Sequence, residues 1–329
     1  MTSYAIGVDL GGTNLRIAAV DENGKLLGKT ALGTEVSRGR EYVVNDLCRA
    51  TREMQERFIN VGRLCGIGVG VPGLIDCETG HVVKSPNLPG WEDFDVKGDI
   101  ERRLETTVVL DNDANVAALG EKWLGAGRNA ESLCMYTLGT GVGGGIILEG
   151  RLWRGWNGMA AELGHCNVEP DGVPCNCGSW GCLEQYASAT AVMRMARERL
   201  AQGSPTLMSE IAVEKLNSRV IYECALRGDA AALQVFERVG RALGVAIASF
   251  INAMNLPLYV IGGGVSSAWD AFAPAMFDEV RKRSFLYART TTADGSGAGG
   301  RKRFTTITQA QLGGEGGLFG AARLPMLVG

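Results

Sequence analysis

Residues 132–155 read SLCMYTLGTGVGGGIILEGRLWRG. Short apolar runs with β-branched residues alternate in this stretch with glycine-containing turns, a pattern that predicts strand, turn, strand, turn and strand. Residues 4–32 have the same layout, with the turn LGGTN after the first apolar run and DENG after the second. A repeat of this kind within one chain indicates that the protein is built from two related halves.

Each predicted set of hairpin strands is followed by further strands and by helices. Buried strands are expected in three apolar runs: CGIGVGVPG at 65–73, TVVLD at 107–111 and LYVIGGGV at 258–265. Apolar side chains at helical spacing, or a helix signal directly after a strand, predict helices at 39–61, 112–125, about 188–202 and about 229–252. Another short helix should follow the glycines of GGEGG, 313–317, near the end of the chain. Strands followed by crossover helices are typical of α/β proteins.

The composition is that of a globular protein with enough chain for two ordinary domains. The 329 residues are 46% hydrophobic and 21% charged, and the formal net charge is −3. The short basic runs at 281–283 and 301–303 are more typical of solvated helix and loop ends, so nucleic acid is not expected as a partner. The sequence has no signal-peptide pattern and no apolar run of membrane-spanning length, so we expect a cytoplasmic protein without a membrane partner.

Three glycine clusters follow predicted strands. Residues 139–144 satisfy G-x-G-x-x-G, but a strand follows where a dinucleotide site would have a helix, and no Walker P-loop pattern occurs. What remains is a hairpin loop whose backbone N–H groups form an anion-binding concavity, to which Thr13 or Thr140 adds a hydroxyl. A single cluster would be more simply a tight hairpin. Three clusters in this order, the third at 262–264, favour a nucleotide site.

The segment LDNDAN, 110–115, lies where a predicted strand meets a predicted helix, and α/β proteins bind ligands at the carboxyl ends of strands. Asn and Asp are also the usual helix-capping residues. Capping needs only one of these side chains, so Asp113 is a candidate to accept a proton from a substrate hydroxyl. The nearby proline-bounded loop SPNLPGW, 85–91, offers Asn87 for hydrogen bonding and Trp91 as a flat apolar surface.

Residues 164–184, GHCNVEPDGVPCNCGSWGCLE, contain four of the nine cysteines and one of the two histidines. A Cys3His set is a usual closed shell for structural zinc, and the set here is His165, Cys175, Cys177 and Cys182. Disulfides are the competing interpretation, but a reducing compartment argues against them. Cys166 is expected simply to be buried. The five isolated cysteines should be buried or inert thiols: Cys48, Cys65, Cys77, Cys134 and Cys224.

Two glutamates lie close to these predicted metal ligands in sequence. Glu162 precedes His165 by three residues, and Glu184 follows Cys182 by two. A metal that joins 165 to 182 would bring both carboxylates toward one place. Carboxylates beside an imidazole suit a sugar, because each sugar hydroxyl can donate to a carboxylate oxygen. The simpler alternative is a pair of solvated surface glutamates, which their position next to the ligands disfavours.

Taken together, these motifs give the chain a resemblance to the ROK family of repressors, open reading frames and kinases, and most of all to its glucose kinases. The matching segments span nearly the whole chain in the family's order: DLGGTN (9–14), VPG (71–73), SPNLPGW (85–91), NDANVAALGE (112–121), LGTGVGGGI (138–146), AELGH (161–165), CNCGSWGCLE (175–184) and IGGGV (261–265). AELGH and CNCGSWGCLE are the most specific of these segments. The family's repressors carry an added N-terminal helix-turn-helix, which is not expected here because the first strand begins at about Tyr4.

The resemblance implies an α/β, actin-like (ribonuclease H-like) ATPase fold with two domains flanking a cleft. The first domain would comprise 1–117 with about 312–329 returning to it, and the second 118–311 with the zinc loop 164–184. The resemblance also implies a homodimer that uses ATP to phosphorylate a hexose, usually at the 6-hydroxyl, with Mg²⁺ accompanying ATP and a structural Zn²⁺.

The same resemblance implies roles for individual residues. Asp113 would be the general base. The sugar ligands would be Asn87, Asn112, Asp113, Glu162, His165 and Glu184. The residues around ATP would be Gly11, Gly12, Thr13, Asn14, Thr140, Gly141, Gly263 and Gly264. His165 would give one ring nitrogen to zinc and the other to a sugar hydroxyl.

Several alternatives stay open at the level of sequence. The hexose could be N-acetylmannosamine, N-acetylglucosamine, fructose or allose, since the sequence does not show the shape of the pocket around C2. A sugar-sensing transcriptional regulator is disfavoured by the negative charge and the missing DNA-binding domain. A chaperone-like or structural actin-fold ATPase would have no use for the sugar residues. The glycine-rich stretch 291–303, which is expected to be a mobile surface loop, lies in a region (284–303) longer than the family leads us to expect and has no assigned role.

Overall fold

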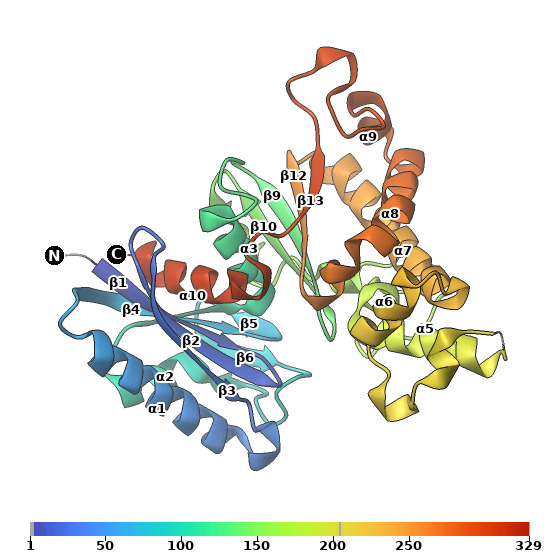
Figure 1. The fold of residues 1–329 in the computed structure, drawn as a ribbon. Helices are drawn as coiled ribbons and strands as arrows, with labels where there is room; N and C mark the ends of the chain where they lie inside the picture. The colour runs from blue at the N-terminus through green and yellow to red at the C-terminus, as the bar shows by residue number, and fades with distance from the viewer. Residues whose placement is uncertain (1–2, 204, 329) are drawn as a thin grey trace. The chain divides into compact units, whose positions relative to one another are not determined.

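The computed structural model describes residues 3–203 and 205–328, which fold into two compact units (Figure 1). The first unit comprises Met1–Ser132, Gly145–Ala161 and Gln311–Gly329, and the second comprises Leu133–Gly144 and Glu162–Ala310. The chain therefore passes from one unit to the other four times. The division expected from the sequence, 1–117 with about 312–329 against 118–311, stays a prediction.

The first unit contains a five-stranded sheet in the order β3-β2-β1-β4-β8. Its strands are β1 (Ser3–Leu10), β2 (Asn14–Asp21), β3 (Leu26–Gly33), β4 (Arg63–Val71) and β8 (Val108–Asn112). β1, β2 and β3 pair antiparallel, whereas β4 runs parallel to both β1 and β8. Every residue of β1 after Ser3 is buried, because this central strand is covered on both faces.

Helices cover the two faces of this sheet (Figure 1). α1 (Arg40–Phe58) and α2 (Val96–Leu104) bury their apolar side chains on one face, and α10 (Gly316–Met326) packs against β1 and β4 on the other. α3 (Asp113–Leu124) packs against α10. Glycine permits these close contacts: a Cβ at Gly68 would lie 1.8 Å from the Ala321 carbonyl oxygen, and one at Gly320 would lie 1.6 Å from that of Val116.

A second sheet repeats this topology. Its strands are β9 (Leu133–Leu138), β10 (Val142–Leu148), β11 (Arg151–Leu152), β12 (Leu258–Gly262) and β13 (Thr306–Gln309). Their order, β11-β10-β9-β12-β13, matches that of the first sheet strand for strand, and β12 runs parallel to both β9 and β13. The internal repeat predicted from the two glycine hairpins is therefore confirmed.

The second unit carries a set of helices: α4 (Glu184–Ala187), α5 (Ala189–Ala201), α6 (Ser218–Leu226), α7 (Ala230–Met254), α8 (Trp269–Arg283) and α9 (Phe285–Thr290). Ser188 and Asp229 start α5 and α7 by accepting backbone N–H groups three residues ahead, at 3.0 and 2.8 Å. The helices predicted at about 188–202 and 229–252 are confirmed. A small sheet of β5 (Leu74–Asp76), β6 (His81–Lys84) and β7 (Phe94–Asp95) in the first unit has no counterpart in the predictions.

The glycine-rich stretch 291–303 is partly ordered by its own hydrogen bonds. Thr291 forms a β-bridge with Gly297, and the Thr292 N–H donates to the Ser296 carbonyl oxygen at 2.8 Å. Asp294 accepts from the Ser296 hydroxyl at 2.9 Å, and its hydrogen bonds with Thr292 and Ser296 lower its pKa to about 2. None of the helices in the described part of the chain combines the length and the apolar character that a membrane span needs.

Glu121, near the end of α3, is a fully buried carboxylate in the first unit. Its oxygens accept the N–H groups of Ala126 at 2.7 Å, Gln311 at 3.1 Å and Leu312 at 2.8 Å. Backbone donors of this kind compensate the loss of hydration that burial imposes on the carboxylate. Glu121 thus holds residues 311 and 312 by hydrogen bonds, where the chain enters the first unit for the last time.

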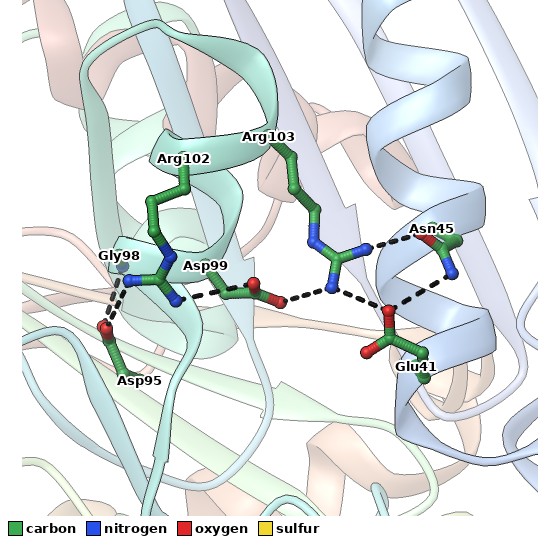
Figure 2. Close-up of polar contacts among 7 residues, drawn as sticks. All are labelled: Glu41, Asn45, Asp95, Gly98, Asp99, Arg102 and Arg103. Atoms are coloured by element: carbon green, nitrogen blue, oxygen red, sulfur yellow. Dashed lines mark hydrogen bonds and ion pairs between the residues drawn. The ribbon is translucent and has the colours of Figure 1, made fainter.

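Two adjacent arginines on α2 differ sharply in their surroundings (Figure 2). The Arg102 side chain is 65% exposed and lies 3.3 Å from Asp95 and 3.5 Å from Asp99. The Arg103 side chain is 24% exposed and lies 3.0 Å from Asp99 and 2.8 Å from Glu41. It also donates to the Asn45 side chain, so Arg103 joins α2 to α1.

We expect Arg103→Met to lower the free energy of unfolding by about 1–2 kcal/mol, because it removes a largely buried guanidinium that pairs with the mostly buried Asp99 and joins α2 to α1. Arg102→Met is the matched control and should cost no more than about 0.5 kcal/mol, since exposed ion pairs contribute little. Chemical denaturation of both variants measures the difference. Equal decreases in the free energy of unfolding for the two variants would show that Arg103 does not stabilise the contact between α1 and α2.

Candidate functional site

The first glycine turn joins β1 to β2 in the first unit. The Gly11 N–H donates to the Asn14 carbonyl oxygen at 2.8 Å, which closes the turn, and the Thr13 and Asn14 side chains are exposed. A Cβ at Gly12 would lie 3.1 Å from the Asn87 carbonyl oxygen. The structure therefore brings Asn87 and the first turn together.

Asp9, near the end of β1, is a buried carboxylate beside the first glycine turn that sequence reasoning did not single out. It is 8% exposed and forms an ion pair with Arg16 on β2. Burial raises the pKa of Asp9, and the guanidinium of Arg16 opposes that effect. The signal in the sequence is a carboxylate within an otherwise apolar strand, two residues before a Gly-Gly turn.

Asn112 and Asp113 begin α3. The Asn112 side chain accepts the N–H groups of Ala114 at 2.8 Å and Asn115 at 3.3 Å, and its amide donates to the Gly73 carbonyl oxygen at 2.9 Å. Asn112 is therefore the helix cap. Asp113 is the first residue of the helix, and its Oδ1 also accepts the Ala114 N–H at 2.9 Å.

A buried ion pair, also missed from the sequence, supports this helix start. Asp111 is fully buried; its Oδ2 accepts from Arg154 Nε at 2.8 Å, and its Oδ1 accepts from Asn115 Nδ2 at 2.9 Å. Burial, with Asp111 nearby, raises the pKa of Cys77 to about 12, so this thiol stays neutral. The junction between β8 and α3 is consequently held by side chains as well as by the backbone.

Trp91 does not offer the flat apolar surface expected from the sequence. It is 1% exposed and packs edge-on against Phe94, with ring centroids 5.6 Å apart. β7, the one strand of the small sheet that follows the loop, supplies Phe94 and so forms part of this core position. Trp91 therefore stabilises the loop that presents Asn87 and makes no surface for a ligand.

In the second unit, the predicted metal ligands lie together. The four ligand atoms of His165, Cys175, Cys177 and Cys182 are all within 4.8 Å of one another. The Cys177 and Cys182 sulfurs are 3.7 Å apart, as are the Cys175 sulfur and His165 Nδ1. In a tetrahedral zinc site with Zn–S bonds of about 2.3 Å, two sulfur ligands lie about 3.8 Å apart. The donor set and its spacing therefore fit a closed, four-coordinate metal site.

The surroundings of the ligands bear on the other cysteine predictions. Gln185 Nε2 lies 3.7 Å from the Cys175 sulfur and donates to it, the kind of outer hydrogen bond that orients metal ligands.

Cys166 is exposed, so the expectation that it is buried was wrong. Its backbone explains the difference: the Cys166 carbonyl oxygen accepts the Leu183 N–H at 2.9 Å, which pins the main chain while the side chain faces outward.

Glu162, His165 and Glu184 also converge within the second unit. His165 Nε2, the nitrogen on the side away from Cys175, lies 3.9 Å from Glu162 Oε2. Burial raises the pKa of Glu162; the charge of Glu184 acts in the same direction and His165 in the opposite one. Two carboxylates and an imidazole thus share one location, beside the metal ligands.

The second and third glycine clusters lie against each other. The Gly139 N–H donates to the Gly141 carbonyl oxygen at 2.9 Å, and the exposed Thr140 lies between them. Gly263 has a φ of +84°, and a Cβ there would lie 2.5 Å from the backbone of Leu138, so only glycine fits. Gly264, by contrast, has open space where its Cβ would be.

The ROK family model matches residues 5–326, and the chain belongs to the ROK family. It is 38% identical over 300 residues to a glucokinase of Halalkalibacterium halodurans, covering 89% of this chain and 88% of that protein. It is 42% identical over 265 residues to a glucokinase of Thermotoga maritima, covering 80% of this chain and 82% of that protein.

Among solved structures, the chain resembles a ROK family glucokinase from Streptomyces griseus in complex with glucose and AMPPNP. The TM-score is 0.81 at 34% sequence identity, and the match covers 98% of each chain. The α/β, actin-like fold expected from the sequence is thereby confirmed.

Proposed function

We infer that this protein is an ATP-dependent hexose kinase that phosphorylates glucose. The observation that carries the inference is the likeness, over 98% of both chains, to a glucokinase in complex with glucose and AMPPNP. The convergence of Glu162, His165 and Glu184 supports it, because carboxylates beside an imidazole can hydrogen-bond the hydroxyls of a sugar. The product would be glucose 6-phosphate, the entry compound of glycolysis.

We propose that Asp113 is the general base. Its carboxylate would accept the proton of the sugar 6-hydroxyl while that oxygen forms a bond to the γ-phosphorus and the bond from phosphorus to the β-phosphate oxygen breaks. The sugar ligands proposed in the first unit are Asn87 and Asn112. Those proposed in the second unit are Glu162, His165 and Glu184.

The glycine turns would hold ATP. Backbone N–H groups in such turns bind phosphate oxygens, and the hydroxyls of Thr13 and Thr140 would add to them. The remaining nucleotide contacts are proposed for Gly11, Gly12, Asn14, Gly141, Gly263 and Gly264. Asp9 is a buried carboxylate two residues before the first turn, paired with Arg16, and we propose that it would help to hold Mg²⁺. When bound with ATP, Mg²⁺ neutralises phosphate charge.

We propose Zn²⁺ for the Cys3His set, where it would act structurally by joining residues 165 and 182. A cytoplasmic location suits the nine free thiols of the structure. The homodimer is proposed on the family resemblance alone.

A coupled assay of purified protein with MgATP and a panel of sugars tests the proposed function. We expect ADP release to require sugar, with glucose giving the highest kcat/KM. Preference for fructose, allose or an N-acetylated hexosamine would change the substrate within the same class. Turnover that does not depend on sugar would support an actin-fold ATPase. Sugar binding without turnover, together with a gel shift of DNA, would support a regulator.

A further inference from the structure

Glu184, the first residue of α4, contacts the second glycine turn directly. Its Oε2 accepts the Val142 N–H at 3.0 Å. A Cβ built on Gly141 would lie 2.3 Å from the same oxygen, far inside van der Waals contact. The carboxylate therefore occupies the space that any larger residue at position 141 would need.

The metal loop and the adjoining helices hold Glu184 against this turn. Glu184 follows the ligand Cys182 by two residues, and the Gln185 N–H donates to the Cys182 carbonyl oxygen at 2.9 Å. Residues just after α4 also hold the turn. The Ala189 N–H donates to the Gly139 carbonyl oxygen, and the Thr190 hydroxyl donates to the Thr140 carbonyl oxygen, both at 2.8 Å.

One carboxylate thus belongs to two sites. Glu184 Oε2 accepts a hydrogen bond from the turn that we propose binds phosphates. The same carboxylate, which lies near Glu162, is one of the proposed sugar ligands. A carboxylate has two oxygens and can accept several hydrogen bonds, so a sugar hydroxyl and the Val142 N–H can share it. Ligands that bias the position of one shared group are coupled, and such coupling is reciprocal.

We propose that Glu184 is a positioning residue that couples the sugar site to the nucleotide turn within the second unit. It orients the peptide between Gly141 and Val142, and the absence of a side chain at Gly141 lets it keep its place beside the sugar. The proposal rests on the proposed hexose kinase function and adds to it a direct link between the two substrate sites.

The first test is the glucose affinity of Gly141→Ala without nucleotide, measured by isothermal titration calorimetry. The added methyl group must displace the Glu184 carboxylate, so we expect the Kd for glucose to rise on the order of 10-fold. Gly139→Ala is the matched control in the same turn, because its Cβ would lie no nearer than 4.0 Å to the atoms around it. Its Kd for glucose should stay within about 2-fold of wild type. Equal Kd values for glucose in Gly141→Ala and Gly139→Ala would overturn the proposal.

The second test runs in the opposite direction. Glu184→Ala should raise the Kd for Mg-AMPPNP, measured without sugar, by about 5-fold or more, because the Val142 N–H loses its acceptor. Glu184→Gln keeps an acceptor oxygen and should bind Mg-AMPPNP nearly as wild type does, although it loses affinity for glucose. Unchanged nucleotide affinity in Glu184→Ala would refute the link even if the Gly141 variant failed to fold. Failure of the wild-type protein to bind either ligand would instead refute the proposed function.

Discussion

Asp113→Asn is expected to lower kcat for glucose phosphorylation by about 10²–10⁴-fold while glucose still binds. Asparagine has nearly the same shape and keeps an oxygen that can accept the Ala114 N–H, so the start of α3 should be preserved. What it cannot do is take up the proton of the sugar hydroxyl. The expected pattern is thus a large loss in kcat with a Kd for glucose close to that of wild type.

Steady-state kinetics and calorimetric titration with glucose measure the two quantities separately. Asp95→Asn is a suitable control, because Asp95 also begins a helix of the first unit and accepts the Gly98 N–H at 2.8 Å. That variant should retain kcat. A near-normal kcat in Asp113→Asn would remove Asp113 from the role of base, and a loss confined to glucose binding would make it a sugar ligand only.

Removal of the metal should have the second large effect. Cys177→Ser, or chelation of the wild-type protein, is expected to unfold the loop 164–184 and to raise the Kd for glucose by about 10-fold or more. Most of residues 176–180 are exposed, and the loop contributes few apolar side chains to the core. The metal would therefore supply much of the free energy that orders it. Without that order, His165, Glu162 and Glu184 lose their shared location.

Cys166→Ser is the matched control for this experiment. Cys166 lies in the same loop, next to His165, and is exposed outside the ligand set. It should keep one metal ion per chain, wild-type glucose affinity and protection of the loop from proteolysis. Glucose affinity that survives complete loss of the metal in Cys177→Ser would show that the loop orders itself and that the metal has another purpose.

The parts of the fold that depend on local sequence were predictable. Glycine hairpins between β-branched runs predicted the two repeated sets of strands, and His165 with the three cysteines, predicted as metal ligands, lie together in the structure. The strands of the small sheet β5-β6-β7 were missed because they span only two to four residues each, too few to show a period. Trp91 was misjudged for the same reason, since Phe94 on β7 is part of what buries it.

Partners that are distant in sequence were also beyond local patterns. Arg154 pairs with Asp111 across 43 residues, and Val142 donates to Glu184 across 42. Neither the segment DND (111–113) nor the segment CLE (182–184) reveals its partner, because the paired segments come together only in the folded protein. Asp9 could have been found, since an ionisable side chain inside an apolar strand must have a compensating group.

The buried carboxylate of Glu121 has a consequence for how the main chain is held. On one side of the last crossing between the units, the Ala310 N–H donates to the Ile261 carbonyl oxygen at 2.9 Å; on the other, the Gln311 N–H donates to Glu121 at 3.1 Å. The main chain is therefore anchored on both sides of the linkage between residues 310 and 311, and Glu121 ties the start of the C-terminal segment to the first unit.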